Sequence, residues 1–236
     1  MVKTYLTRGL LVGLAAGAFA FGFAKLVGEP QIGRAERFEH SVARQLGETP
    51  PPELVSRTVQ STAGLATGVL VAGVGLGGLY ALVFAATYRR FTAAGPRPTA
   101  ALLAACGFVA VFLVPFLKYP ANPPSAGDPD TIGQRTAVYF LLVLFSVLSV
   151  ILAASVRSLL VPRLGAWNGT VLAALSYVGL VIVAYLVMPG TDPVPAAFPA
   201  TALWRFRLAS VGVQAVLWAT LGIGFGALTE RREATP

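Results

Sequence analysis

Long apolar runs alternate with short polar segments along the whole chain. A helix needs about 20 apolar residues to cross a hydrocarbon core of about 30 Å. Runs of about that length occupy residues 10–27, 59–87, 100–117, 137–156, 170–188 and 208–228. The pattern predicts an all-α fold, a polytopic transmembrane helical bundle of about six spans that forms one integral membrane domain over residues 1–236.

The polar segment between the first two runs, residues 28–58, has a helical pattern of its own. Glu29-Pro30 is typical of a turn. Beyond it, apolar side chains recur at helical spacing, at Ala35, Phe38, Val42 and Leu46. We expect an outer loop that carries a short helix at about 35–46, lying in the plane of the membrane interface.

Small residues recur within three of the runs, mostly three or four positions apart. They are Gly9, Gly13, Ala16, Gly17 and Ala20 in the first, Gly64, Gly68, Gly73 and Gly77 in the second, and Ala215, Ala219, Gly222 and Gly226 in the last. Such spacing lets helix backbones approach closely. We expect these three helices to pack tightly.

Composition supports a membrane protein and excludes several other classes. The chain is 56% hydrophobic and 12% charged, with a net charge of +8 and a mean hydropathy of +0.71. We assign the positive charge to loops that face anionic lipid, and we expect the lipid bilayer and no nucleic acid as a partner. With one cysteine, Cys106, and one histidine, His40, the chain cannot form an internal disulfide or a Cys/His zinc site.

The loops predict an orientation. With six spans, one side holds Lys3, Arg8, Arg89, Arg90, Arg97, Arg157, Arg163, Arg231 and Arg232, with Glu230 and Glu233 as its only acidic residues. Basic residues in short loops mark the cytoplasmic side. We therefore expect both termini in the cytoplasm and a multi-pass location in the membrane. The alternative for the first run is a cleaved signal peptide ending near Ala18-Phe19-Ala20.

The outer segment 115–136 concentrates proline and charge. Thr131-Ile132-Gly133-Gln134 has the form of a capping box for the fourth span, and Asp130 is the alternative N-cap. Asp128 is either a turn residue or a metal ligand, with Asp130 beside it. Lys118 and Arg135 either extend to the membrane interface or neutralise these two carboxylates.

The predicted outer helix carries a second set of candidate metal ligands. Glu36, Glu39 and His40 share one face, and Glu36 lies one helical turn from His40. Imidazole and carboxylate groups bind divalent first-row metals, so this face could dock such an ion weakly. The simpler interpretation is a solvated face with Glu–Arg pairs. In the last outer loop, Arg205 and Arg207 either anchor the sixth span or pair with the loop carboxylates.

Four segments carry a resemblance to a known family. They are GLLVGLAAGAFAFGFAKLVGEPQIGRAERFE at 9–39, ELVSRTVQSTAGLATG at 53–68, FVAVFLVPFLKYPANPPSAGDPDTIGQRT at 108–136 and WRFRLASVGVQAVLWATLGIGFG at 204–226. Together they resemble the CbtA family of bacterial membrane proteins, whose members are regarded as probable cobalt-transporter subunits. Descriptions of that family usually give five spans, so five remains the alternative to six.

The resemblance implies a cobalt import function linked to cobalamin biosynthesis, with a small single-span, histidine-rich companion (CbtB-like). It also implies transport-related roles for a set of outer polar residues: Glu29, Glu36, Lys118, Asp128, Asp130, Arg135, Arg205 and Arg207. We expect cobalt or another divalent metal as substrate, no permanently bound cofactor and no enzymatic activity. Self-association into a homo-oligomer is left open. The alternative is a non-transporting membrane partner or assembly protein that docks another protein through its rigid outer loops.

Overall fold

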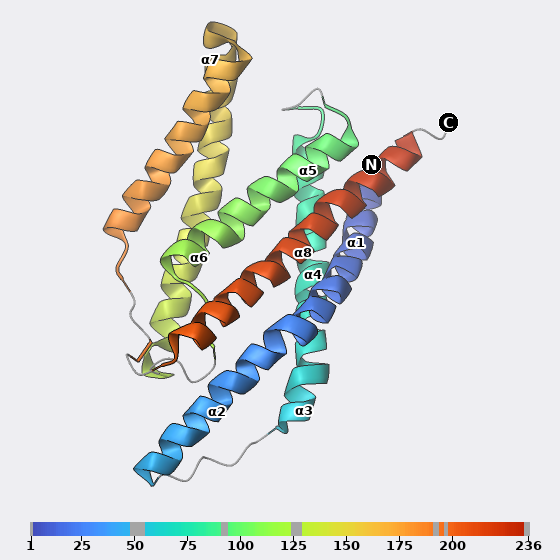
Figure 1. Cartoon of the computed structure of the whole chain (residues 1–236). Helices are drawn as coiled ribbons and strands as arrows, with labels where there is room; N and C mark the ends of the chain where they lie inside the picture. The colour runs from blue at the N-terminus through green and yellow to red at the C-terminus, as the bar shows by residue number, and fades with distance from the viewer. Residues whose placement is uncertain are drawn as a thin grey trace. The chain divides into compact units, whose positions relative to one another are not determined.

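The computed structural model describes residues 2–47, 55–90, 94–123, 129–190, 194–195 and 198–233, and these contain helices and no strand. The chain divides into two compact units. Unit 1 comprises Met1–Gly107, Asn122–Ala126 and Ala196–Pro236, and unit 2 comprises Phe108–Ala121 and Gly127–Pro195. Each unit is described separately below (Figure 1).

Five helices of the described residues are long and apolar enough to cross a membrane. They are Val2–Leu46, Arg57–Thr87, Pro96–Lys118, Ile132–Val187 and Ala200–Arg231. The all-helical class predicted from the apolar runs is therefore confirmed. The count of five differs from the six predicted runs because the helix Ile132–Val187, 56 residues long, contains both the fourth and the fifth run.

In unit 1, α1 (Val2–Phe23) packs lengthwise against α4 (Leu65–Thr87). Glycine makes this approach possible. A Cβ atom on Gly13 would lie 2.3 Å from the carbonyl oxygen of Gly73, and one on Gly77 would lie 2.2 Å from that of Gly9. The predicted close approach of the first two helices is confirmed, but it uses only part of the second glycine series. A Cβ on Gly68 would meet nothing within 4 Å.

The last helix, α8 (Ala200–Glu233), packs on both α1 and α5 (Pro96–Gly107). Against α5, a Cβ on Gly222 would lie 2.7 Å from the Cβ of Ala104. Deeper in unit 1, the fully buried rings of Phe84 and Phe225 meet edge to face, with centroids 4.9 Å apart. Small residues on the helix surfaces and aromatic rings between them thus form the core of unit 1.

The predicted turn at Glu29-Pro30 is wrong, because one helix runs without interruption from Val2 to Leu46. A π-helical turn, η1 (Ala24–Gly28), joins α1 directly to α2 (Glu29–Leu46). Pro30 lies just after η1, where the π-helical turn already interrupts the regular i to i−4 pattern of the continuous helix. The helix over 35–46 is present, as the outer part of a helix of 45 residues. At 1.5 Å per residue that helix is about 67 Å long, roughly twice the hydrocarbon thickness.

A similar arrangement precedes α4. The short helix α3 (Arg57–Val59) leads into a π-helical turn, η2 (Gln60–Gly64), and then into α4. In Figure 1, α2 and α3 both extend beyond the region where α1 and α4 pack together. The helix Val2–Leu46 therefore contains a π-helical turn after its apolar part, and the helix Arg57–Thr87 contains one before its apolar part.

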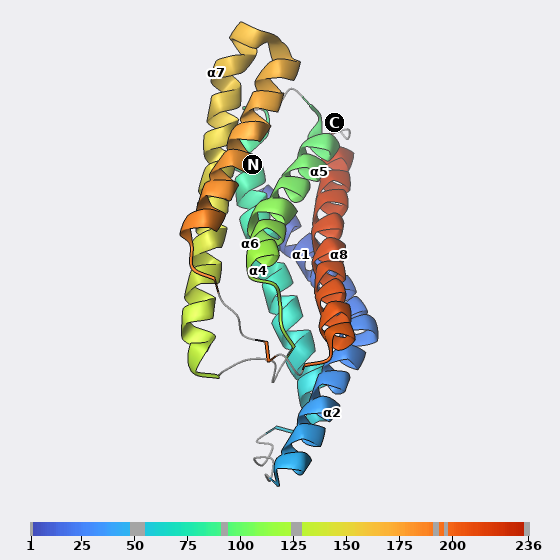
Figure 2. The same ribbon diagram turned by 60° about the vertical axis from the view of Figure 1, so that its left-hand side comes forward.

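Unit 2 is built largely from α7 (Ile132–Val187), which doubles back on itself (Figures 1 and 2). Its backbone leaves the helical conformation at Gly165, where φ is 79° and ψ is 164°. The two arms are joined by a hydrogen bond between the hydroxyls of Ser146 and Tyr177, 2.9 Å apart. The label α7 thus covers two helices joined by a sharp turn at Gly165, and the predicted runs 137–156 and 170–188 lie on these two antiparallel arms.

Unit 2 also contains the end of the Pro96–Lys118 helix and the start of α7. The former comprises the π-helical segment η3 (Phe108–Leu113) and α6 (Val114–Lys118), and the latter follows a 3-10 turn, η4 (Pro129–Thr131). Thr131 occupies the N-cap position without a capping hydrogen bond from its side chain, so the predicted capping box does not form. Its backbone is already helical, at φ −92° and ψ −2°, whereas a capping threonine needs an extended backbone.

Candidate functional site

The two π-helical turns of unit 1 are linked by a lysine. Lys25, in η1, donates from Nζ to the backbone oxygen of Ser61, in η2, at 2.9 Å, and to its Oγ at 3.1 Å. A π-helical turn interrupts the regular i to i−4 pattern, which leaves backbone oxygens available for other donors. Lys25 uses one of them, and it thereby ties the α1–α2 helix to the α3–α4 helix at the boundary of their apolar parts.

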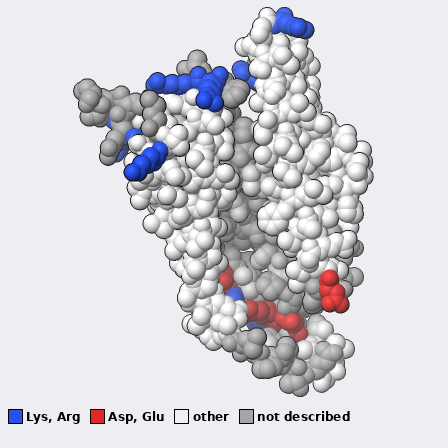
Figure 3. Space-filling view, turned by 180° about the vertical axis from the view of Figure 1, so that it is seen from behind, with Lys and Arg blue, Asp and Glu red and all other residues white. Residues whose placement is uncertain are grey.

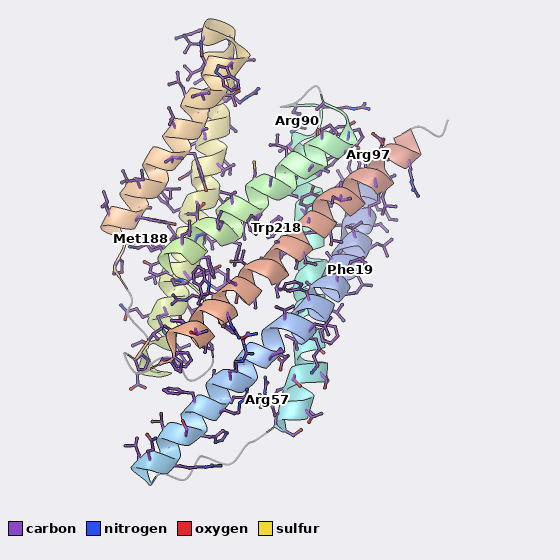
Figure 4. All side chains as sticks on the ribbon, in the orientation of Figure 1. Phe19, Arg57, Arg90, Arg97, Met188 and Trp218 are labelled. Carbon is purple, nitrogen blue, oxygen red and sulfur yellow. The ribbon has the colours of Figure 1, made fainter. Side chains whose placement is uncertain are left out.

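Arg57, at the start of α3, bridges two carboxylates of α2. Its Nη2 lies 2.6 Å from Oε2 of Glu29, and its Nε lies 2.7 Å from Oε1 of Glu36. The exposed fractions of the side chains are 31% for Arg57, 13% for Glu29 and 29% for Glu36. Figure 4 shows Arg57 between α2 and α3. We call Lys25, Glu29, Glu36, Arg57 and Ser61 the polar layer of unit 1.

The polar layer balances its charges internally, with two basic and two acidic side chains. Glu29 and Glu36 are seven residues apart, which is two helical turns, so they face the same side of α2. The guanidinium group lies between them, in the place where a free cation would interact with both carboxylates. Charge-assisted pairs of this kind are stronger than neutral hydrogen bonds, particularly when they are partly buried.

The remaining candidate ligands on α2 are exposed. Glu39 and His40 lie on the exposed surface of the helix, while Glu36 turns toward Arg57. Among the residues that the structure describes, no group of three or more His, Cys, Asp or Glu side chains could hold a metal ion. The structure thus brings Glu36 together with Glu29, a pairing that the sequence did not indicate. The metal-binding role of Glu36, Glu39 and His40 stays a prediction.

The candidate residues of segment 115–136 lie in unit 2, apart from Asp128, which falls outside the described residues. Asp130 is exposed in η4. Lys118 donates to the backbone oxygen of Tyr185 at 2.8 Å, and its ammonium group lies 5.6 Å from the ring centroid of Tyr119. This contact joins the end of α6 to the end of α7. Arg135 lies half-buried in the first turns of α7.

The two arginines of the last outer segment differ in their surroundings. Arg207 donates from Nη2 to Oδ1 of Asn122 at 2.9 Å, within unit 1. Arg205 is exposed, as is the neighbouring Trp204. For Arg207, the described contact is with an amide side chain, so it connects α8 to the segment that follows α6.

Sequence reasoning missed three members of the polar layer, namely Lys25, Arg57 and Ser61. The available signal was position, because Lys25 ends the first apolar run and Arg57 immediately precedes the second. The contacts of Lys25 with Ser61 and of Arg57 with Glu29 depend on a helix that continues through Glu29, where the sequence had predicted a turn. In Figure 3, the acidic side chains of unit 1 gather at the end that carries this layer, and basic side chains gather at the opposite end.

Among the described residues, five helices long and apolar enough to cross a membrane define an all-helical, multi-pass membrane protein. Comparison with protein families then gives a specific assignment. Residues 2–230 match the family described as "Probable cobalt transporter subunit (CbtA)", so the chain belongs to the CbtA family. Searches of curated proteins and of solved structures each returned no match. The family description is that of a subunit of a transporter, and it names cobalt as the substrate of that transporter.

Proposed function

We propose that this protein is part of a divalent metal transport system that imports cobalt for cobalamin biosynthesis. In this proposal it resides in the bacterial plasma membrane and works with a small single-span, histidine-rich companion protein. Its outer surface collects the cation before passage across the membrane. The residues proposed for collection are Glu36, Glu39 and His40 on α2 and Asp128 and Asp130 before α7.

The observation that best supports this role is the bridge from Arg57 to Glu29 and Glu36. Two carboxylates at the end of the apolar helices are held around a protein cation, at 2.6 and 2.7 Å. Carboxylate oxygens bind divalent metals once they are released from such a partner. Arg57 then acts as a competing cation that keeps the pair neutral until a metal arrives.

The proposal includes a six-crossing topology with both termini in the cytoplasm. Within unit 1, the start of α1 and the end of α8 lie at the same end, as the contact of Tyr5 with Phe225 supports (Figure 2). The reversal of α7 at Gly165 supplies the additional crossing. The polar layer would then face the outside, where an imported cation arrives first.

Cobalt accumulation in cells is the direct measurement of this role. Cells that express the chain together with a histidine-rich companion should accumulate more cobalt than cells with either protein alone. Glu36→Gln should lower that accumulation several-fold, because it removes a proposed ligand. Arg44→Gln is the matched control, since Arg44 is exposed on the same helix and belongs to no proposed site.

Binding to the purified protein separates collection from transport. Arg57→Gln should strengthen Co²⁺ binding measured by calorimetry, because it leaves two neighbouring carboxylates without their cation. Asp128→Asn should weaken accumulation if the outer segment before α7 contributes ligands. Accumulation that does not depend on expression of the chain, and that neither Glu36→Gln nor Asp128→Asn changes, would exclude the transport role.

A second candidate function is a non-transporting membrane partner that docks another protein. It is favoured by the charge balance of the polar layer and by the lack of a three-ligand metal group among the described residues. In that case the companion should co-purify with the chain equally well with and without Glu36→Gln, and cobalt accumulation should be insensitive to this substitution.

A further inference from the structure

The end of unit 1 opposite the polar layer is strongly basic. It carries Lys3 and Arg8 from α1, Arg89 and Arg90 after α4, Arg97 from α5, and Arg231 from α8. The described carboxylate at this end is Glu230, whose Oε2 lies 2.6 Å from Nε of Arg97. Figure 4 shows Arg90 and Arg97 at this end, and Figure 3 shows the concentration of basic side chains there.

Aromatic rings lie directly beneath these charges. Tyr5 meets Phe84 edge to face at 5.5 Å between centroids, and Tyr88 stacks on Phe84 at 4.9 Å. The guanidinium group of Arg8 lies 5.8 Å from the Tyr5 ring centroid, and that of Arg89 lies 5.2 Å from the Tyr88 centroid. Tyrosine prefers the headgroup level of a membrane, so lipid phosphates are expected at the level of these arginines.

Arg89 adopts a backbone conformation that an arginine seldom adopts. Its φ is 62°, and among the described residues it is the one non-glycine residue with a positive φ. This left-handed conformation follows the end of α4 at Thr87, a place where chains usually have glycine. Residues with a strained backbone of this kind cluster at functional sites, where the role of the side chain compensates for the energy cost of the strain.

We propose that this basic and aromatic end of unit 1 binds the headgroup of an anionic phospholipid, and that Arg89 is held in its strained conformation to contact the phosphate. Basic residues between transmembrane helices recognise such headgroups. Apolar side chains continue the surface along α4, where Leu79 and Leu82 are exposed and can contact an acyl chain. That continuity favours a lipid over a free phosphate ion. The inference does not depend on cobalt transport.

Lipid binding to the purified full-length protein can be measured by native mass spectrometry in a neutral detergent. The probes are phosphatidylglycerol as the anionic lipid, phosphatidylcholine as the zwitterionic lipid with the same chains, and inorganic phosphate as the free anion. We expect phosphatidylglycerol to bind several-fold more tightly than phosphatidylcholine, and phosphate at the same concentration not to displace it. Raising the salt concentration should reduce the preference.

Arg89→Gly is the informative variant, because glycine accepts the native backbone conformation and removes only the side chain. Each basic residue near a lipid surface contributes about fivefold in affinity. Arg89→Gly should therefore weaken phosphatidylglycerol binding about fivefold while its melting temperature in detergent stays equal or rises. Arg44→Gln, which removes an exposed charge on α2, should bind lipid as the unchanged protein does.

Three results would overturn the proposal. The first is phosphatidylglycerol binding that Arg89→Gly leaves unchanged. The second is equal binding of phosphatidylglycerol and phosphatidylcholine. The third is full displacement by inorganic phosphate, which would indicate an anion site without lipid specificity. Because none of these measurements involves cobalt, their failure would leave the proposed transport function unaffected.

Discussion

At the residue scale, glycine residues determine how closely α1 and α4 approach each other. The carbonyl oxygens of Gly9 and Gly73 occupy the positions that side chains would need on Gly77 and Gly13. Because hydrophobic burial does not drive association between helices within lipid, close backbone packing contributes a large share of their attraction. One added methyl group at this contact therefore has a larger effect than its size suggests.

Gly77→Ala should destabilise the protein, since its Cβ would lie 2.2 Å from the oxygen of Gly9. Overpacking of this kind costs about 1–3 kcal/mol, and each kcal/mol lowers the melting temperature by roughly 2–4 °C in a chain of this size. Thermal unfolding in detergent measures the effect. Gly68→Ala is the control on the same helix, because nothing lies within 4 Å of its added Cβ. Equal melting temperatures for the two variants would contradict the packing argument.

Some of these residue roles could be predicted from the sequence and others could not. Spacing alone identified the glycine series in the first two helices, because it is a local property of one helix. It could not show that Gly73 and Gly77 form the contact while Gly68 does not, since that depends on where two helices cross. The bridge from Arg57 to Glu29 and Glu36 was missed for the same reason, as it joins residues from two separate helices.

At the element scale, α7 shows how one residue can reverse a helix. Its backbone departs from helical geometry at Gly165. Close packing follows immediately, because a Cβ on Gly169 would lie 2.9 Å from the backbone nitrogen of Val161. Farther along, Arg157 donates from Nε to Oγ1 of Thr170 at 3.0 Å. The apolar pattern predicted both arms correctly because each has the length of a bilayer crossing.

Gly165→Ala should disturb this reversal. A φ of 79° with a ψ of 164° lies in a region that is essentially restricted to glycine, and occupying it costs another residue of order 1–3 kcal/mol. A lower melting temperature in detergent is the expected result. Gly179→Ala, on the second arm, has open space around its added Cβ and serves as the control. A variant at Gly165 as stable as the one at Gly179 would show that the reversal does not depend on glycine.

The start of α2 was harder to predict from the sequence than the two arms of α7. Glu29-Pro30 has the local chemistry of a turn, yet the helix continues because Pro30 directly follows η1, where the π-helical turn already interrupts the i to i−4 pattern. Contacts from elsewhere in unit 1 support the continuation. Phe38 meets Phe198 edge to face at 5.3 Å, and Ala35 is buried. Tertiary packing of this kind overrides local sequence preferences.

At the scale of the whole molecule, the acidic side chains among the described residues lie mainly at one end of each unit, whereas basic side chains lie at both ends. In unit 1, the basic end formed by the start of α1 and the end of α8 lies opposite the polar layer. In unit 2, Arg157 and Arg163 flank the reversal of α7, whereas Lys118 and Asp130 lie near the opposite ends of its arms. An end at which basic residues outnumber the described carboxylate, Glu230, is the pattern expected for a cytoplasmic face.

Cysteine labelling can map the proposed six-crossing topology directly. In a Cys106→Ser background, Thr4→Cys and Ser158→Cys should react only with a reagent that enters the cytoplasm, because both residues are exposed near basic ends. Ser41→Cys, on exposed α2, should react from outside the cell. Outside reactivity at Ser158, or tags at the two termini that report opposite sides, would instead support a five-crossing arrangement.

The unbroken helix from Val2 to Leu46 also has a mechanical consequence. Its N-terminal half packs against α4 through Gly9 and Gly13, while its C-terminal part extends about 27 Å beyond Gly28 at 1.5 Å per residue. A helix of this length is a stiff rod, so it acts as a lever whose pivot is the π-helical turn held by Lys25. A partner protein that pulls on the arm beyond Gly28 would transmit its force to the glycine contact between α1 and α4.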